Sequence, residues 1–335
     1  MTHQSILRRA VLCAVAAIAL LSSPAALADT ATTTTGGVLP LYRGLYYSDA
    51  QLAAVRDAVE KEPWRVEMRD RITSAADAWV ARSDEDIRAL LPKPGALFSH
   101  GKTGCPKCMA KWGSNGSDTC SLDRPGKLLC PKCKTMFPDA DPAGRFHDAG
   151  RGVEVEGRRH HLTAVWNSYV VNTMYAAEGA DNAGVSSLAL AYALTGREEY
   201  ARKAVAMMDA LATLAPTTLG PRDYDTGARD SDQGRFHFFT STVFRAMIPM
   251  ARNIDLVGSH PMMRADSPTN PGTTVFDNIR KGLYEDYLFR HNDVRGARLS
   301  SLHNHEADSV RAMVAAGLLF DNADYIRWGM QCFDA

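Results

Sequence analysis

The stretch VSSLALAYALTGREEY, from Val185 to Tyr200, decides how the fold is read. Its first part favours a helix, and Thr195-Gly196 ends that helix because glycine readily takes the left-handed conformation of a C-cap. A second helix begins near Arg197 and ends at Pro216. Its apolar face consists of Tyr200, Ala204, Met207, Met208, Leu211 and Leu214. This pattern predicts a helical hairpin with a very short turn.

Helical patterns continue on both sides of this hairpin. Ser48 and Gln51 form a capping-box pair at the start of a first helix, and Pro63 suits the first turn of the next. Further helices are expected around 166–175, over 238–257, 275–290 and 305–320, and from about Asp324. Strand signals are scarce. Paired helices with short loops indicate an all-α layered or toroidal array.

The N-terminus has the pattern of a secretory signal. Arg8 and Arg9 precede an apolar run from Ala10 to Leu21, and Ala26-Leu27-Ala28 fits a cleavage site. We expect residues 1–28 to be a signal peptide, with an uncleaved anchor as the alternative, and 29–44 to be a flexible linker. The mature chain is expected to be soluble and periplasmic or secreted, with no membrane contact after cleavage.

The charges of the whole chain balance. Lys and Arg number 38, and Asp and Glu number 38, so the formal net charge is zero. A chain without net charge lacks the field expected of a nucleic-acid or membrane-surface protein, while a local basic patch is still compatible with it.

Residues 99–148 lose helical periodicity and are rich in Gly, Pro, Lys and Cys. They contain two near copies of one motif, Cys105-Pro-Lys-Cys108 and Cys130-Pro-Lys-Cys133. Two such turns can supply four thiolates to a closed, tetrahedral, structural Zn²⁺ site with no open position for catalysis. Disulfides are the competing interpretation, because the expected compartment is oxidising. Cys120 is the odd cysteine and a candidate free thiol.

The stretch Leu302-His-Asn-His-Glu306 places two imidazoles, an amide and a carboxylate within five positions. Apolar residues then recur at helical spacing through Phe320. The polar cluster is therefore expected on the first helical turn, where free backbone N–H groups and the dipole favour anions. Alternatively, Asn304 only caps the helix and His305 is a core histidine.

Other candidates for substrate contacts lie upstream. Arg235-Phe-His-Phe-Phe239 could line a sugar cleft, with Arg235 for a carboxylate and His237 beside aromatic rings, or could be helix core with a surface Arg. Tyr224 lies in a charged loop, and Trp166 opens a helix that could face a cleft or the core. The run Arg158-Arg-His-His161 is either a basic patch or a metal pair, and the surface is expected.

Four stretches of the chain together resemble the heparinase II/III-like polysaccharide lyases, which include alginate lyase relatives. The resemblance spans roughly Leu45 to the C-terminus. It rests on Leu190–Gly196 followed by Tyr200-Ala201, and on Ala251–Leu256, where Asn253 replaces the family's aromatic residue. It also rests on Asn304-His305 opening a helix that is followed by Gly317–Asn322, and on the cysteine knuckles.

The resemblance implies an incomplete (α/α) toroid with a small zinc-ribbon-like insert. The toroid would comprise N-terminal helices at 45–98 and a portion at 149–335, with the insert at 99–148. It implies β-elimination on a uronic-acid polysaccharide, which would be the partner, and no cofactor for the chemistry beyond structural zinc. Asn304 matches the family's carboxylate-neutralising Asn, and His305 matches its neighbouring His. Arg235, His237, Tyr224 and Trp166 are then candidates for substrate binding.

The family's catalytic Tyr lies several helices beyond this Asn, and its C-terminal β-sandwich domain follows. We therefore expect this chain to be a truncated N-terminal part with little activity alone. Two other classes remain open. One is a non-catalytic, zinc-containing carbohydrate-binding protein, and the other is a glycoside hydrolase on a similar toroid with Asp223 and Glu306 as its acid pair.

Overall fold

A computed structural model describes residues 44–98, 104–112, 116–139, 143–175, 183–218, 240–289 and 304–331. Side chains at 240–244, 287–289 and 304–306 are outside this description. All described elements belong to the compact unit Pro40–Ala335. The expected signal peptide lies outside the described residues.

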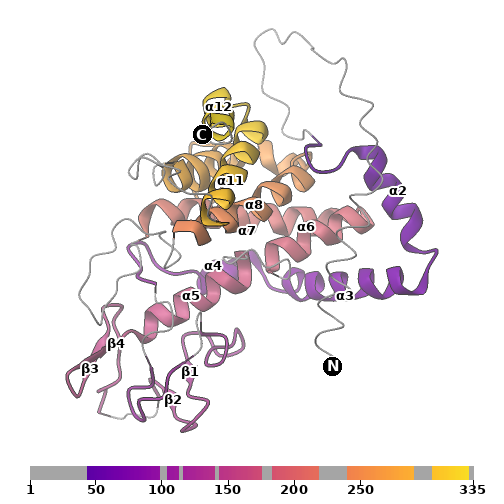
Figure 1. Cartoon of the computed structure of the whole chain (residues 1–335). Helices are drawn as coiled ribbons and strands as arrows, with labels where there is room; N and C mark the ends of the chain where they lie inside the picture. Colours follow the sequence, from indigo (N-terminus) through magenta and orange to yellow (C-terminus); the bar gives the residue numbers. More distant parts are fainter. Residues whose placement is uncertain are drawn as a thin grey trace. The chain divides into compact units, whose positions relative to one another are not determined.

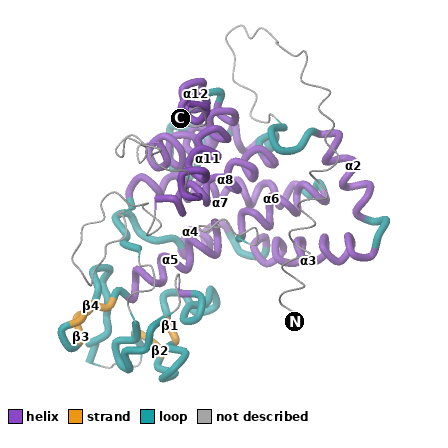
Figure 2. The backbone as a smooth tube through the Cα atoms, viewed as in Figure 1, coloured by secondary structure: helices purple, strands orange, loops and turns teal. Residues whose placement is uncertain are grey.

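The described chain is mostly helical (Figures 1 and 2). Its helices, in chain order, are α2 (Asp49–Val59), α3 (Pro63–Val80), α4 (Asp84–Leu90), α5 (Leu162–Tyr175), α6 (Gly184–Thr195), α7 (Glu198–Leu214), α8 (Thr240–Val257), α9 (Val275–Ile279), α11 (Asn304–Phe320) and α12 (Ala323–Gln331). Two short 3₁₀ turns, η2 (Ala215–Thr217) and η3 (Pro261–Arg264), and the π-helical η4 (Arg280–Phe289) complete the set. None of the helices in these ranges combines the length and apolar content needed to cross a bilayer.

The start of the helical region follows the local signals in the sequence. Ser48 Oγ accepts a hydrogen bond from the Gln51 backbone N–H at 3.3 Å, and Gln51 Oε1 accepts from the Ser48 N–H at 2.8 Å. Pro63 occupies the first position of α3, where its missing N–H leaves no helical bond unmade. Both predictions are confirmed.

The hairpin of α6 and α7 forms the centre of the helical core. Gly196 ends α6 with φ +71°, as its left-handed C-cap. Helix α6 packs against α2, α3, α5, α7 and α8, and α8 in turn packs against α11. Helices α11 and α12 form a second close pair. The expected helical hairpins with short turns are therefore present.

A buried carboxylate ties α7 to the segment before α9. Asp209 is fully buried and accepts hydrogen bonds from Ser267 Oγ at 2.7 Å, Thr269 Oγ1 at 2.7 Å and Asn278 Nδ2 at 2.8 Å. Because a buried carboxylate must be hydrogen-bonded to remain in the core, these neutral donors hold residues 267–278 against α7.

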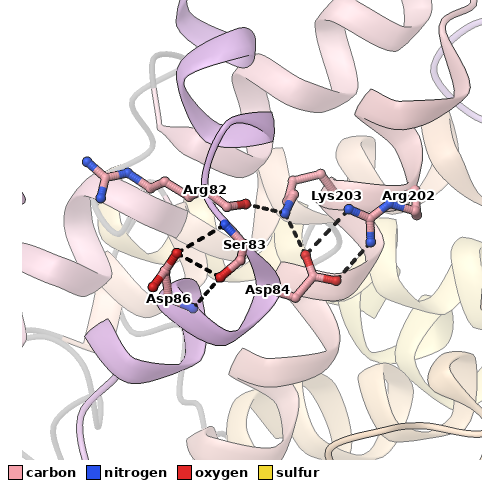
Figure 3. A network of polar contacts seen from close by, with 6 residues as sticks. All are labelled: Arg82, Ser83, Asp84, Asp86, Arg202 and Lys203. Atoms are coloured by element: carbon pink, nitrogen blue, oxygen red, sulfur yellow. Dashed lines mark hydrogen bonds and ion pairs between the residues drawn. The ribbon is translucent and has the colours of Figure 1, made fainter.

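Helix α4 is joined to α7 by charges (Figure 3). Lys203 Nζ donates to Asp84 Oδ1 at 2.5 Å and to the Arg82 carbonyl oxygen at 2.6 Å. Arg202 reaches the other carboxylate oxygen of Asp84 at 2.8 Å. Ser83 caps α4 by accepting from the Asp86 N–H at 3.0 Å. The start of α4 is thus fixed by a cap and by two cations of α7.

Between α4 and α5 the chain forms a lobe of turns and very short strands. Strands β1 (Leu128–Leu129) and β2 (Met136–Phe137) pair antiparallel, as do β3 (Val153–Val155) and β4 (Arg158–His160). Glu156 and Gly157 join β3 to β4, and both have positive φ, as a two-residue hairpin turn requires. The non-helical segment therefore continues to His161.

Candidate functional site

The first cysteine motif folds as a tight knuckle. The Cys105 N–H donates to the Ala110 carbonyl oxygen at 2.8 Å, and the Met109 N–H donates to the Cys105 carbonyl oxygen at 2.9 Å. Met109 takes the left-handed conformation, with φ +56°. These bonds turn the backbone so that the thiols of Cys105 and Cys108 face the same side.

The second motif repeats this backbone. The Cys130 N–H donates to the Thr135 carbonyl oxygen at 2.9 Å, and the Lys134 N–H donates to the Cys130 carbonyl oxygen at 3.0 Å. Lys134 has φ +56°, the same value as Met109. The duplication read in the sequence is therefore a structural duplication as well, and each copy presents two thiols.

The two knuckles bring their four sulfur atoms to one place. All four Sγ atoms of Cys105, Cys108, Cys130 and Cys133 lie within 4.8 Å of one another. The Cys105–Cys133 separation is 3.7 Å and the Cys108–Cys130 separation is 3.8 Å. A tetrahedral site with Zn–S bonds of about 2.3 Å has S···S separations of about 3.8 Å. The donor set and its spacing therefore fit one metal ion.

The same distances bear on the disulfide alternative. A disulfide requires sulfur atoms about 2.05 Å apart, and the described cysteines, including the buried Cys120, all carry free thiols. Cys105 and Cys130 are fully buried, and Cys108 and Cys133 are partly exposed. This arrangement can hold a metal ion with all four protein ligands and leaves no open coordination position.

The environment prepares part of the site for ionisation. Burial raises the pKa of the Cys105 thiol. At Cys133, burial acts in the same direction, but hydrogen bonds with Thr135 and the neighbouring thiols outweigh it and lower the pKa to about 6. Because a cysteine binds a metal ion as its thiolate, the second knuckle can supply one ligand at neutral pH, and metal binding would release the protons of the remaining thiols.

A small aromatic core supports the knuckles. Phe137 is fully buried, with its ring 6.1 Å from that of Trp112 and 5.2 Å, edge to face, from that of Phe146. Leu128 on β1 is also buried here. This core is small for a segment of its length, and a metal ion is the usual additional stabilisation for such segments.

The two adjacent histidines at the end of the lobe are buried, so their expected surface position is wrong. His160 and His161 are 4% and 1% exposed. His160 Nδ1 lies 2.9 Å from the carbonyl oxygen of Gly104, directly before the first knuckle. Burial lowers the pKa of His161 to about 4, and Asp148 opposes this shift. His160 pairs with Val153 across β4 and β3, a contact that no local pattern indicated.

Helix α11 begins at Asn304, so the predicted position of Asn304, His305 and Glu306 in its first turn is confirmed. Their side chains lie outside the described part of the chain. One turn further on, Asp308 accepts a hydrogen bond from Arg245 Nε of α8 at 2.8 Å. This ion pair was missed in the sequence, although the i to i+4 spacing from Asn304 places Asp308 on the same helix face.

The remaining candidates fall into two groups. Tyr224, Arg235 and His237, as well as Asp223 of the hydrolase alternative, lie outside the described residues. Trp166 is 8% exposed on α5, within the hydrophobic core, and its ring lies 5.8 Å from that of Tyr169. A role of these residues in substrate binding stays a prediction.

The described residues line cavities of different character. A largely apolar one of about 340 Å³ is lined by Leu45, Tyr46, Ile248, Val310, Arg311, Val314, Ala315, Leu318 and Met330. A polar one of about 470 Å³ lies between α2, α3 and the α6–α7 turn, where Arg56, Arg69 and Arg197 already bind carbonyl or carboxylate oxygens.

Comparison of the chain with protein-family models, curated proteins and solved structures finds no match.

Proposed function

We propose that this chain is the helical part of a heparinase II/III-like polysaccharide lyase that is exported and cleaves a uronic-acid polysaccharide by β-elimination. In this proposal its helical hairpins form part of an (α/α) toroid. The lobe between α4 and α5, which we call the cysteine lobe, is a zinc-holding insert. The carrying observation is that Asn304 and His305 begin α11, a helix whose body is packed against α8.

The position of Asn304 suits an anionic ligand. The first turn of a helix has backbone N–H groups without helical partners, and the helix dipole is positive there. A uronate carboxylate at this end would meet these groups and the Asn304 amide. The Arg245–Asp308 ion pair one turn further on fixes this end of α11 against α8.

β-Elimination makes three demands on the site. The carboxylate must be neutralised so that the C5 proton becomes removable, a base must take this proton, and an acid must protonate O4 as the C4–O4 bond breaks. The product carries a C4–C5 double bond. We assign neutralisation to Asn304, and we assign His305 as its helper or as the base. The acid is not assigned among the described residues.

The cysteine lobe has a structural role in this proposal. The four sulfur atoms have the separations of a tetrahedral zinc site, and a closed four-thiolate site offers no position for substrate. Zinc would hold the two knuckles together, and the His160–Gly104 contact would hold them against β4.

The decisive assay measures the ultraviolet absorbance of 4,5-unsaturated uronate released from polyuronates. It should be applied to this chain and to any longer product of its gene. In an active protein, Asn304→Ala should abolish turnover while circular dichroism and thermal unfolding stay close to wild type. Reducing ends released without the double bond would instead support a glycoside hydrolase.

A matched control addresses the possibility that Asn304 only caps α11. Asn322 caps α12, where its Oδ1 accepts from the N–H groups of Asp324 at 3.1 Å and Tyr325 at 3.2 Å. Asn322→Ala should lower stability by about 1 kcal/mol and leave turnover unchanged. If Asn304→Ala behaves like Asn322→Ala, the catalytic assignment of Asn304 is wrong.

A further inference from the structure

The cysteine lobe carries a surplus of positive charge that the rest of the chain does not. Its described residues, 104–112, 116–139 and 143–161, contain ten Lys and Arg against six Asp and Glu. The whole chain has 38 of each sign. The surplus of four positive charges is therefore local, and it must be offset elsewhere in the sequence.

The cations of the lobe are also less paired than those of the helices. Most described arginines of the helical region make ion pairs, for example Arg69 with Asp70, Arg202 with Asp84 and Arg245 with Asp308. Six cations of the lobe are exposed and have no ion pair with any described residue. They are Lys107, Lys111, Lys132, Lys134, Arg151 and Arg158.

Four of these six belong to the knuckles, and we call Lys107, Lys111, Lys132 and Lys134 the knuckle lysines. Lys107 and Lys132 occupy the same position in the two Cys-Pro-Lys-Cys motifs, and Lys134 directly follows Cys133. Because the sulfur atoms lie within 4.8 Å of one another, the Cα atoms of these three lysines lie within about 18 Å of one another. The convergence of the cysteines thus keeps Lys107, Lys132 and Lys134 in one part of the lobe, where all three are exposed.

Neutralisation of the negative charge of the metal site does not account for these lysines. Four thiolates and one Zn²⁺ carry a net charge of about −2, less than the lobe's surplus of four. Backbone N–H groups of Lys107 and Lys132 approach the sulfur atoms. Within the described residues, no lysine ammonium donates to a sulfur atom. The ammonium groups are available to a ligand outside the lobe.

We propose that the knuckle lysines form a docking surface for an anionic polysaccharide, separate from the proposed catalytic helix. The choice of a polyuronate as the ligand rests on the proposed function. A polyuronate presents carboxylates at regular intervals, and each can accept a hydrogen bond from an ammonium group. Several such contacts hold the polymer at the protein without requiring a deep pocket.

In its described residues, the lobe lacks the features that nucleic-acid-binding proteins add to positive charge. Its described aromatic rings, Trp112, Phe137 and Phe146, are all buried, so none is available to stack on a base. The segment contains only two- and three-residue strands and no α-helix in its described residues, so it offers no element to enter a major groove. Charge without stacking favours a polyanion that has no bases to stack.

The test measures binding of the zinc-loaded full chain to polygalacturonate and alginate at low salt, with neutral dextran and duplex DNA in parallel. The variant Lys107→Gln/Lys111→Gln/Lys132→Gln/Lys134→Gln should bind the polyuronates at least about tenfold more weakly. Added salt should weaken wild-type binding, because it screens exposed charges. Zinc content and thermal unfolding should stay at wild-type values.

A second variant removes the same amount of charge elsewhere. Lys61→Gln/Arg88→Gln/Lys281→Gln/Arg264→Gln changes four exposed cations of the helical region that make no ion pair with described residues. The affinity of this variant for the polyuronates should change by less than about twofold. Equal losses in both variants would overturn the proposal, because binding would then follow net charge alone.

Three other results would also overturn it. The first is no polyuronate binding by wild type, the second is tighter binding of duplex DNA than of polyuronate, and the third is zinc loss in the knuckle variant. None depends on turnover, so failure of the lyase assay leaves the docking surface standing. Retained polyuronate binding by Asn304→Ala is expected if the two surfaces are separate.

Discussion

Lys203 Nζ lies 2.5 Å from Asp84 Oδ1, and the lysine side chain is only 2% exposed. Asp84 is more accessible, with 30% of its side chain exposed, and it also binds Arg202. The two partners of this ion pair therefore differ in what remains after one is removed (Figure 3). Loss of Asp84 leaves a buried ammonium, whereas loss of Lys203 leaves a carboxylate that water and Arg202 can satisfy.

This asymmetry predicts unequal effects on stability. Asp84→Ala should lower the free energy of unfolding by about 3–5 kcal/mol, because it leaves a buried charge whose one remaining acceptor among the described residues is the Arg82 carbonyl. Lys203→Met should cost only about 1–2 kcal/mol, since it replaces the charge with an apolar chain of similar length. Urea unfolding of both variants and of the double mutant measures the difference.

The double mutant provides the internal check. Asp84→Ala/Lys203→Met should be more stable than Asp84→Ala alone, because the second change removes the charge that the first leaves uncompensated. The exposed Asp86, which lies on the same helix and interacts with Ser83, serves as a control. Asp86→Ala should cost about 1 kcal/mol or less. A larger loss for Lys203→Met than for Asp84→Ala would contradict this account.

The metal centre gives a second prediction. The purified chain should contain about one zinc per molecule, and Cys105→Ser should lose it, because three thiolates and a hydroxyl make a poorer site. The midpoint of thermal unfolding should then fall by about 2–4 °C for each kcal/mol of lost binding energy. Elemental analysis and calorimetry measure the two effects.

Cys120 supplies the control for this experiment. It is buried in the same lobe, but it does not belong to the group of four sulfur atoms. Burial raises its pKa to about 11, so it stays a thiol at neutral pH. Cys120→Ser should keep wild-type zinc content. Equal zinc loss in both variants, or no zinc in wild type, would exclude the four-thiolate site.

Local signals in the sequence were sufficient for several elements. Gly196 ends α6 because only a residue tolerant of positive φ fits that cap, and Pro63 begins α3 because its ring suits a first turn. Asn304 begins α11 as its helical spacing indicated. The convergence of Cys105 and Cys130 was also readable, because each motif is a self-contained turn whose chemistry calls for a second copy.

Features that depend on distant contacts were not readable. His160 is buried because β4 pairs with β3 and because Gly104, distant in sequence, supplies a carbonyl oxygen to its ring. Val153–Val155 is too short for its alternation to identify a strand. The helix expected over 275–290 begins at Val275 but becomes π-helical after Ile279, where it packs against α7.

A third prediction concerns two glycines that serve different purposes. A Cβ at Gly282 would lie 2.1 Å from the Ala212 carbonyl oxygen of α7, a contact that backbone atoms cannot relieve. A Cβ at Gly196 would meet only Arg56, at 3.7 Å, so only the positive φ opposes it. Gly282→Ala should cost about 3 kcal/mol or more, and Gly196→Ala about 1 kcal/mol.

Chemical denaturation of both variants tests this difference. Gly282→Ala should also shift the packing of η4 on α7, which near-ultraviolet circular dichroism can detect through the buried Tyr284. Gly196→Asn offers a further comparison, because asparagine tolerates the left-handed conformation better than alanine does. It should recover part of the stability lost in Gly196→Ala. Equal costs for the two alanine variants would show that the close approach of η4 and α7 is wrong.

A fourth prediction concerns acid and follows from the burial of His161, which lowers its pKa to about 4 against the opposing effect of Asp148. The unfolded chain takes up a proton near the ordinary value of 6.5, whereas the folded chain does so only near 4. The unfolded state therefore binds more protons between these pH values, and stability falls as the pH falls through this window. The loss from this residue should total about 2–3 kcal/mol by pH 4.

Two variants isolate this effect from other acid-sensitive groups. His161→Gln stays neutral, so between about pH 7 and pH 4 its free energy of unfolding should decline less steeply than that of wild type. His147→Gln replaces an exposed histidine of the same lobe and serves as the control for loss of an imidazole. Because thiols and carboxylates titrate alike in all three proteins, the difference between the curves reports His161. Parallel curves for wild type and His161→Gln would mean that His161 is protonated as readily in the folded chain as in the unfolded one.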